Sequence, residues 1–128
     1  MSSTVAAGTA LVRLADLPEG ATREFILGGG DWPPSGFLVR TGGEVHAYLN
    51  RCPHALRPLN FMPDRFLTPD GGLIQCSAHG ALFEKHTGMC IAGPCLDESL
   101  RRIAVRVVDG SICLDETLDL ARLERWPR

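Results

Sequence analysis

The chain has 128 residues, 45% hydrophobic and 22% charged, which is typical of one globular domain and excludes an enzyme with separate cofactor and substrate domains. Thirteen lysines and arginines against fifteen aspartates and glutamates give a formal net charge of −2, which argues against nucleic-acid binding by phosphate neutralisation. The uncharged runs are too short or too broken by glycine and proline to cross a bilayer, and no positive charge precedes Arg13. We therefore expect no membrane association, no secretory signal and a cytoplasmic location.

Fourteen glycines and nine prolines favour short strands separated by turns. Residues 1–8 are expected to form a disordered tail. Alternating or apolar segments predict strands at residues 11–14, 21–27, 36–40, 44–49, 73–75, 81–83, 89–91, 103–108 and 112–114. The turns Thr41-Gly42-Gly43 and Asp109-Gly110 predict two hairpins. Residues 117–126 carry spaced leucines and predict a short helix or an ordered tail, so the expected fold is an all-β domain of small stacked antiparallel sheets.

The five cysteines point to metal binding more than to a disulfide framework, because their number is odd and no secretory signal is expected. Two of them stand beside histidines, in Cys52-Pro53-His54 and in Cys76-Ser77-Ala78-His79. The two pairs are separated by 21 residues and supply four ligands on two loops. One cysteine and one histidine from each loop differ from the usual groupings of a structural zinc ribbon and match a diiron cluster with two thiolates and two imidazoles. The alternative for either pair alone is a buried thiol that lies near a histidine by chance.

These pairs and their surroundings resemble the Rieske [2Fe–2S] motif, Cys-x-His followed by Cys-x-x-His-Gly. The turn Thr87-Gly88, the dipeptide Gly93-Pro94 and the hairpin around Asp109-Gly110 also resemble the family's later elements, so the similarity runs from about residue 10 to 115. The chain departs from the pattern in the gap between the two loops, which is about five residues longer than usual, mostly within residues 60–72. We expect an enlarged surface loop there, at little cost in stability.

The resemblance implies a Rieske domain over residues 9–115, with a cluster-binding subdomain at about 50–95 and a C-terminal helix or tail at 116–128. It also implies that Cys52 and Cys76 bind one iron and that His54 and His79 bind the other, as the exposed port for electrons. Proline and glycine close to these ligands are expected to stiffen the loops, although each also fits an ordinary turn; these residues are Pro53, Gly80 and Pro94.

The remaining cysteines, histidines and arginines are each assigned a role or are expected to have none. Cys90, Cys95 and Cys113 are interpreted as bystanders because the ligand set is complete without them. His46 and His86 lack an obvious partner and are interpreted as structural or exposed. Family members of high potential carry a disulfide and two hydroxyl side chains near the cluster, and here the corresponding residues lack both groups; they are Arg57, Ala78, Ala81 and Phe83. Arg51 and Arg57 could steer an acidic partner, or form only a solvated rim.

The resemblance implies a ferredoxin that passes one electron from a reductase to an oxygenase or similar acceptor, with no catalytic residues of its own. Only His46 and His86 remain for a second metal, too few for the mononuclear iron of a terminal oxygenase. Two alternatives stay open. One is a small electron-transfer subunit of the nitrite-reductase kind, with residues 118–126 as a docking element. The other is a structural zinc domain without a redox role.

Overall fold

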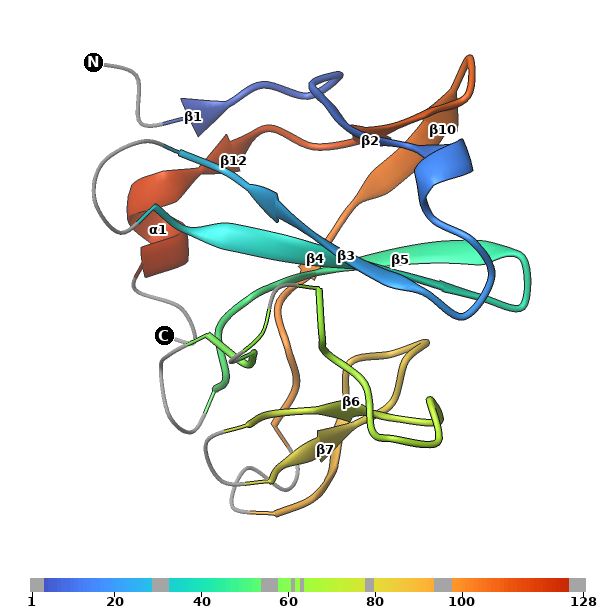
Figure 1. Ribbon diagram of the computed structural model, residues 1–128. Coiled ribbons are helices and arrows are strands. Elements are labelled where there is room, and N and C mark those ends of the chain that lie inside the picture. Colours follow the sequence, from blue (N-terminus) through green and yellow to red (C-terminus); the bar gives the residue numbers. More distant parts are fainter. Residues whose placement is uncertain are drawn as a thin grey trace.

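The computed structural model describes residues 4–28, 33–53, 58–60, 62, 64–77, 80–93 and 98–124. Nearly all of its regular structure is antiparallel β, which confirms the expected fold class (Figure 1). The elements are β1 (Thr4–Val5), β2 (Ala10–Arg13), the 3-10 helix η1 (Leu14–Asp16), β3 (Thr22–Ile26), β4 (Ser35–Thr41), β5 (Glu44–Leu49), β6 (Ile74–Gln75), β7 (Leu82–Phe83), β8 (Cys90–Ala92), β9 (Arg102–Ile103), β10 (Val105–Val108), β11 (Ser111–Leu114), β12 (Leu118–Asp119) and α1 (Leu120–Glu124). No helix in this described part is long and apolar enough to span a membrane.

A four-stranded sheet in the order β3-β4-β5-β9 forms the central layer. Strand β4 is buried along almost its whole length because both faces of this sheet are covered. One face, through Leu38 and Ala47, packs on the sheet β10-β11-β2, and the pair β1-β12 contributes to the same core. We call these three sheets, with α1, the base. The other face, through Phe37 and Tyr48, packs on a separate three-stranded sheet.

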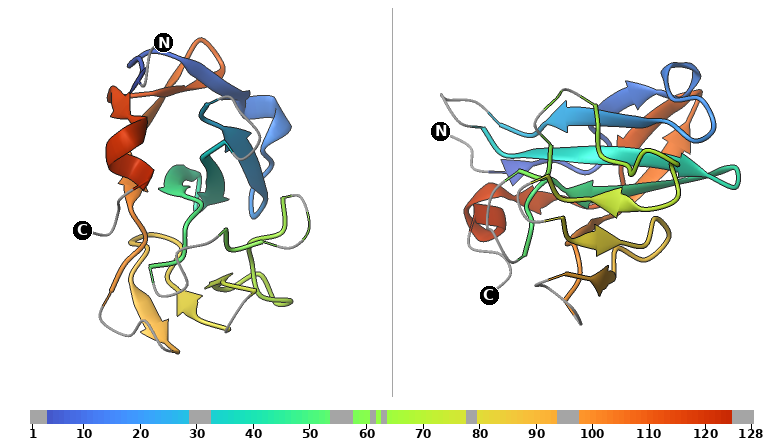
Figure 2. Two further views of the ribbon diagram at one scale, coloured as in Figure 1. Left: turned by 90° about the vertical axis from the view of Figure 1, so that its left-hand side faces the viewer. Right: turned by 60° about the horizontal axis from the view of Figure 1, so that its bottom comes forward.

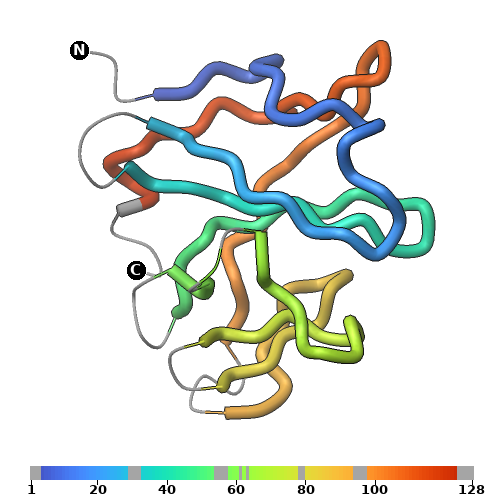
Figure 3. The backbone as a smooth tube through the Cα atoms, viewed as in Figure 1, coloured from blue at the N-terminus to red at the C-terminus, as the bar shows by residue number. Residues whose placement is uncertain are grey.

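That second sheet, in the order β6-β7-β8, and the loops around it form what we call the small unit. The chain leaves the base after β5 and returns to it at β9, so the small unit is one continuous insertion between two neighbouring strands (Figures 1 and 3). Two further views show the same division (Figure 2). The core between the two parts contains Phe37 stacked on Phe66 with ring centroids 4.2 Å apart. The candidate ligand loops both belong to the small unit.

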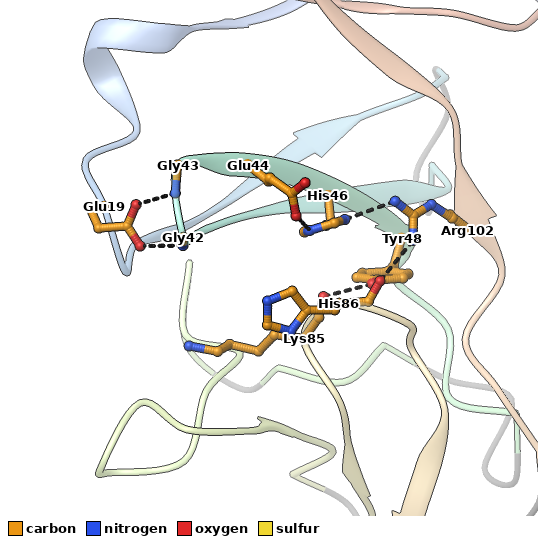
Figure 4. Close-up of polar contacts among 9 residues, drawn as sticks. All are labelled: Glu19, Gly42, Gly43, Glu44, His46, Tyr48, Lys85, His86 and Arg102. Atoms are coloured by element: carbon orange, nitrogen blue, oxygen red, sulfur yellow. Dashed lines mark hydrogen bonds and ion pairs between the residues drawn. The ribbon is translucent and has the colours of Figure 1, made fainter.

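Both predicted hairpins are present. Strands β4 and β5 pair from Gly36↔Leu49 to Thr41↔Glu44, and β10 pairs with β11 across Asp109-Gly110. Gly42 and Gly43 have φ of 61° and 78°, the left-handed values that a two-residue turn of this type needs. The Glu19 carboxylate accepts hydrogen bonds from both of their amides, at 2.8 and 2.9 Å, and these bonds lower the pKa of Glu19 (Figure 4).

The predicted strand at residues 103–108 is divided between two sheets. Arg102 and Ile103 pair with β5, whereas residues 105–108 pair with β11. The change occurs at Ala104, whose amide donates to the Glu116 carboxylate at 2.8 Å and whose carbonyl accepts from Asp115 N–H at 2.8 Å. At Ala104, hydrogen bonds with the Glu116 side chain and the Asp115 backbone thus replace the hydrogen bonds between paired strands.

The ends of the chain differ in part from the expectation. Residues 1–8 were predicted as a disordered tail, but Thr4 and Val5 form β1 and pair with Asp119 and Leu118. Val5 also packs against the base core, which explains why this segment is held. At the other end α1 forms as a short helix, and Leu118 and Leu123 are buried in the same core. The described part of the C-terminal segment therefore packs on its own domain.

Candidate metal centre

Asn50, which directly follows β5, holds the two ends of the first candidate loop together. The backbone N–H of Asn50 donates to the Ser35 carbonyl at 2.9 Å, and the side-chain oxygen of Asn50 accepts from Leu59 N–H at 2.9 Å. Residues 50 and 59 therefore stand side by side, with Cys52 between them in the chain. The resulting closed loop starts from a strand that is buried on both faces, which gives it a rigid foundation.

Glu24 completes a polar cluster beneath this loop. Its carboxylate accepts from Ser35 Oγ at 2.8 Å, from Asn50 Nδ2 at 3.1 Å and from Asn60 Nδ2 at 3.2 Å. Asn50 Nδ2 also lies 3.1 Å from Ser35 Oγ and 3.0 Å from Asn60 Oδ1. Three donors compensate the partly buried carboxylate, so the cluster joins β3, β4 and both ends of the loop. Sequence reasoning gave none of these residues a role; the only signal was that asparagines bracket the loop.

The enlarged loop is attached to the open edge of β3. Asp64, with φ of 61°, accepts a hydrogen bond from Glu24 N–H at 2.8 Å through its carboxylate. Its backbone carbonyl accepts from Thr22 Oγ1 at 2.5 Å. The extra residues therefore cover part of an edge that no strand of the described residues pairs with, a common protection of such edges.

The second candidate loop connects β6 to β7, and hydrogen bonds join its described ends. Cys76 N–H donates to the Ala81 carbonyl at 2.9 Å, and Gly80 N–H donates to the Cys76 carbonyl at 3.0 Å. Gly80 has φ of 71°, while a Cβ added there would meet no described atom, so the backbone conformation is what favours glycine. At Gly93 space matters as well, because a Cβ would lie 2.9 Å from the Ala81 Cα.

The two loops are connected to each other and share one apolar environment. Ser77 N–H donates to the Leu59 carbonyl at 2.7 Å, which joins the second loop to the end of the first. Cys52 is 1% exposed and Cys76 is fully buried, and both belong to the core between the base and the small unit. The structure therefore brings two cysteine side chains from distant parts of the sequence into one cluster of buried apolar residues.

The remaining predicted ligands, His54 and His79, lie outside the described residues, as do Arg57, Ala78, Pro94 and Cys95. Within the described part, no three histidine, cysteine, aspartate or glutamate side chains are grouped as a metal site. The complete ligand set therefore stays a prediction. Pro53 is buried, and Arg51 is half-buried beside the first loop.

The other described cysteines occupy different places. Cys90 is buried in the same core as Cys52 and Cys76, with its Sγ 3.3 Å from the Ala92 carbonyl. Cys113 lies on β11, and its Sγ is 3.8 Å from the Ser111 carbonyl. Their role as bystanders stays a prediction.

The expectation that His46 and His86 lack partners is wrong. His46 is 7% exposed, and its Nδ1 lies 2.8 Å from Arg102 Nη2 while its Nε2 lies 3.4 Å from Glu44 Oε1 (Figure 4). The His86 ring lies edge-to-face against the His46 ring, with centroids 5.6 Å apart. The sequence could not show the contacts of His46 with Arg102 and His86, because they join β5 to β9 and to a turn that are distant along the chain.

The family model of the Rieske [2Fe–2S] domain matches residues 9–114 of this chain. The chain belongs to the Rieske family. Its relatives include the 3-phenylpropionate/cinnamic acid dioxygenase ferredoxin subunit of Escherichia coli K12, 30% identical over 102 residues that cover 80% of this chain and 87% of the relative. The ferredoxin of carbazole 1,9a-dioxygenase from Nocardioides aromaticivorans IC177 is 25% identical, with a TM-score of 0.67, and the match covers 87% of this chain and 99% of that one.

A third relative is much longer. Human apoptosis-inducing factor 3 is 32% identical over 117 residues, which cover 91% of this Rieske chain but only 18% of the human protein. The chain thus spans less than a fifth of that relative, whereas it spans nearly the whole of the two bacterial ferredoxins.

The cofactor of a Rieske domain is a [2Fe–2S] cluster, and the described residues fit it. Thiolates are the soft ligands that iron–sulfur clusters use, and a buried thiolate needs a compensating cation. Cys52 and Cys76 provide two such sulfurs in an apolar environment that limits access of water. The family membership favours this cofactor over the structural zinc alternative.

Proposed function

We propose that this Rieske chain is a one-electron carrier between a reductase and an oxygenase or similar acceptor, and that it acts in the cytoplasm without being an enzyme itself. The observation that carries the proposal is the pair of buried cysteines on two connected loops of a Rieske fold. Relatives of similar length are named as ferredoxins of dioxygenases, which supports an oxygenase as the acceptor.

In this proposal Cys52 and Cys76 hold one iron and His54 and His79 hold the other. When bound, the cluster takes up and releases one electron. The two thiolates are the only charged protein ligands, and an oxidised cluster with two such ligands and two neutral imidazoles has no net charge. Reduction is therefore easier than in a ferredoxin with four thiolates.

The chain's own residues set the environment of the electron. The apolar core around both cysteines limits access of water, and the Asn50 and Ser77–Leu59 hydrogen bonds hold the described ends of both loops. Loop ends held in this way need little rearrangement when the charge of the site changes. The histidine side of the site is the expected contact with redox partners.

Measurement of the reduction potential tests this function. Ala81 and Phe83 are buried next to the second loop and have no hydroxyl that could donate a hydrogen bond to a sulfur. Because such bonds raise the potential, we expect a value near the low end of the Rieske range, about −150 mV, and a transfer of one electron per molecule. Voltammetry of the purified protein at pH 7 should show one reversible wave. A clearly positive potential would contradict the role of a low-potential ferredoxin.

A further inference from the structure

A junction of polar contacts holds the β7–β8 turn of the small unit against the base. Tyr48 Oη donates to the Lys85 carbonyl at 2.7 Å, and Arg102 Nη1 donates to the His86 carbonyl at 2.8 Å (Figure 4). Gly88, with φ of 76°, lies so near that a Cβ there would be 2.8 Å from Tyr48 Cε1. Two adjacent carbonyls and a glycine thus fit the turn closely onto two strands of the base.

His46 orients the guanidinium of Arg102. A guanidinium can only donate, so His46 Nδ1 must accept the 2.8 Å hydrogen bond from Arg102 Nη2. The neutral imidazole then carries its proton on Nε2, the atom that faces Glu44 Oε1 at 3.4 Å. Arg102 therefore spans two acceptors, one on β5 and one on the turn.

Burial, together with the positive charge of Arg102, favours the neutral form of the His46 imidazole. Three titratable or charged groups face it: Arg102 from β9, His86 from the turn and Glu44 from its own strand. Burial and then Arg102 lower the pKa of His46 below 6.5, with a smaller effect of His86, while Glu44 acts in the opposite direction. Protonation would place a hydrogen on Nδ1, facing the guanidinium, and would remove the acceptor.

The turn lies at the end of β7 opposite the second ligand loop, and β7 itself has only two residues. We propose that Arg102 is a positioning residue for the electron transfer described above: it fixes the turn and thereby the second ligand loop, and neutral His46 keeps it in place. This inference rests on the proposed function. Acidification releases Arg102, loosens the β7–β8 hairpin and exposes the loop that carries Cys76.

Amide hydrogen exchange of the cluster-loaded protein between pH 5 and 7.5 tests the proposal, with peptides that cover residues 76–92. At pH 7 Arg102→Gln should exchange about tenfold faster in this segment than wild type, because two hydrogen bonds of the junction are lost. Arg106→Gln is the matched control, because Arg106 is an exposed strand arginine whose ion pair is with Asp115, at 3.6 Å, and not with the β7–β8 turn. It should exchange like wild type.

The dependence of amide protection on pH distinguishes a positioning role of Arg102 that needs neutral His46 from a general effect of Arg102 on stability. Wild type and Arg106→Gln should show equal amide protection at each pH, and both should lose protection on acidification. His46→Asn should keep its protection on acidification. Asparagine offers an oxygen acceptor near the place of Nδ1 and does not titrate. Bleaching of the visible spectrum by a chelator should accelerate in the same variants and at the same pH.

Equal protection in Arg102→Gln and Arg106→Gln would overturn the proposal, and so would an unchanged acid response in His46→Asn. If Arg102→Gln does not fold, Arg102→Lys serves instead, because one ammonium cannot span both acceptors as a guanidinium does. A colourless protein would refute the proposed function, while the same exchange comparison made on that protein without a cluster would still test the junction.

Discussion

Among the residues that the structure describes, the Asn50 side chain has four hydrogen-bond partners: Glu24, Ser35, Leu59 and Asn60. It is 5% exposed, so water cannot replace these partners. Asn50 directly follows β5 and connects the base to the first ligand loop. Asn50 is neither a predicted ligand nor part of the apolar core, yet its hydrogen bonds position the start of the loop that carries Cys52.

Replacement of Asn50 by alanine should lower the free energy of unfolding by about 1–3 kcal/mol, because it leaves Leu59 N–H and part of the Glu24 carboxylate unsatisfied. Urea denaturation of the cluster-loaded protein measures the change. Asn60→Ala is the control: it removes hydrogen bonds of the same cluster at a more exposed position and should cost less. A variant at position 50 as stable as wild type would contradict this role.

The cysteines that are not predicted as ligands give a second test at this scale. Replacement of Cys90, Cys95 and Cys113, one at a time and together, by alanine should leave the visible spectrum unchanged. Cys90 is the demanding case because it shares a core with Cys52 and Cys76. If any single variant loses the spectrum, the set of ligands is not the one proposed.

At the scale of elements, local signals predicted the hairpins well because the glycine turns and the apolar segments lie within a few residues of each other. The pairing of β1 with β12 carries no local signal, since Val5 and Leu118 meet only in the folded chain. The division of β9 from β10 was missed for the same reason, because it depends on Glu116. In the site, the spacing of the Cys/His pairs predicted two loops, whereas the Asn50 cluster and the Arg102 junction are contacts between distant segments.

Glu116 is expected to stabilise the change of sheet at Ala104 only while it is ionised. Burial alone would raise its pKa, but hydrogen bonds from Arg101 and from Ala104 N–H hold the pKa below its usual value. The stabilisation is therefore complete above about pH 4.5 and is lost as the pH falls through the lower value of the folded state. Glu116→Gln should cost about 1 kcal/mol at pH 7. Thermal unfolding at several pH values should show this difference shrinking below pH 4.5; a constant difference would contradict the ionic role.

At the scale of the whole molecule, the central sheet separates two cores with different purposes. One joins the sheets of the base, and the other joins the base to the small unit and contains both candidate cysteine ligands. Because the second core surrounds the cysteines, binding of the cluster and packing of the small unit are expected to stabilise each other. The base then acts as a support, and the small unit lies at one end of the molecule (Figure 1).

Analysis of iron and acid-labile sulfide in the purified protein tests the central claim most directly. A Rieske cluster held by Cys52, His54, Cys76 and His79 requires two irons and two sulfides per chain. The account predicts this stoichiometry in a red-brown protein, and its loss in Cys76→Ser. One zinc per chain with no sulfide, or a coloured and stable Cys76→Ser protein, would contradict it.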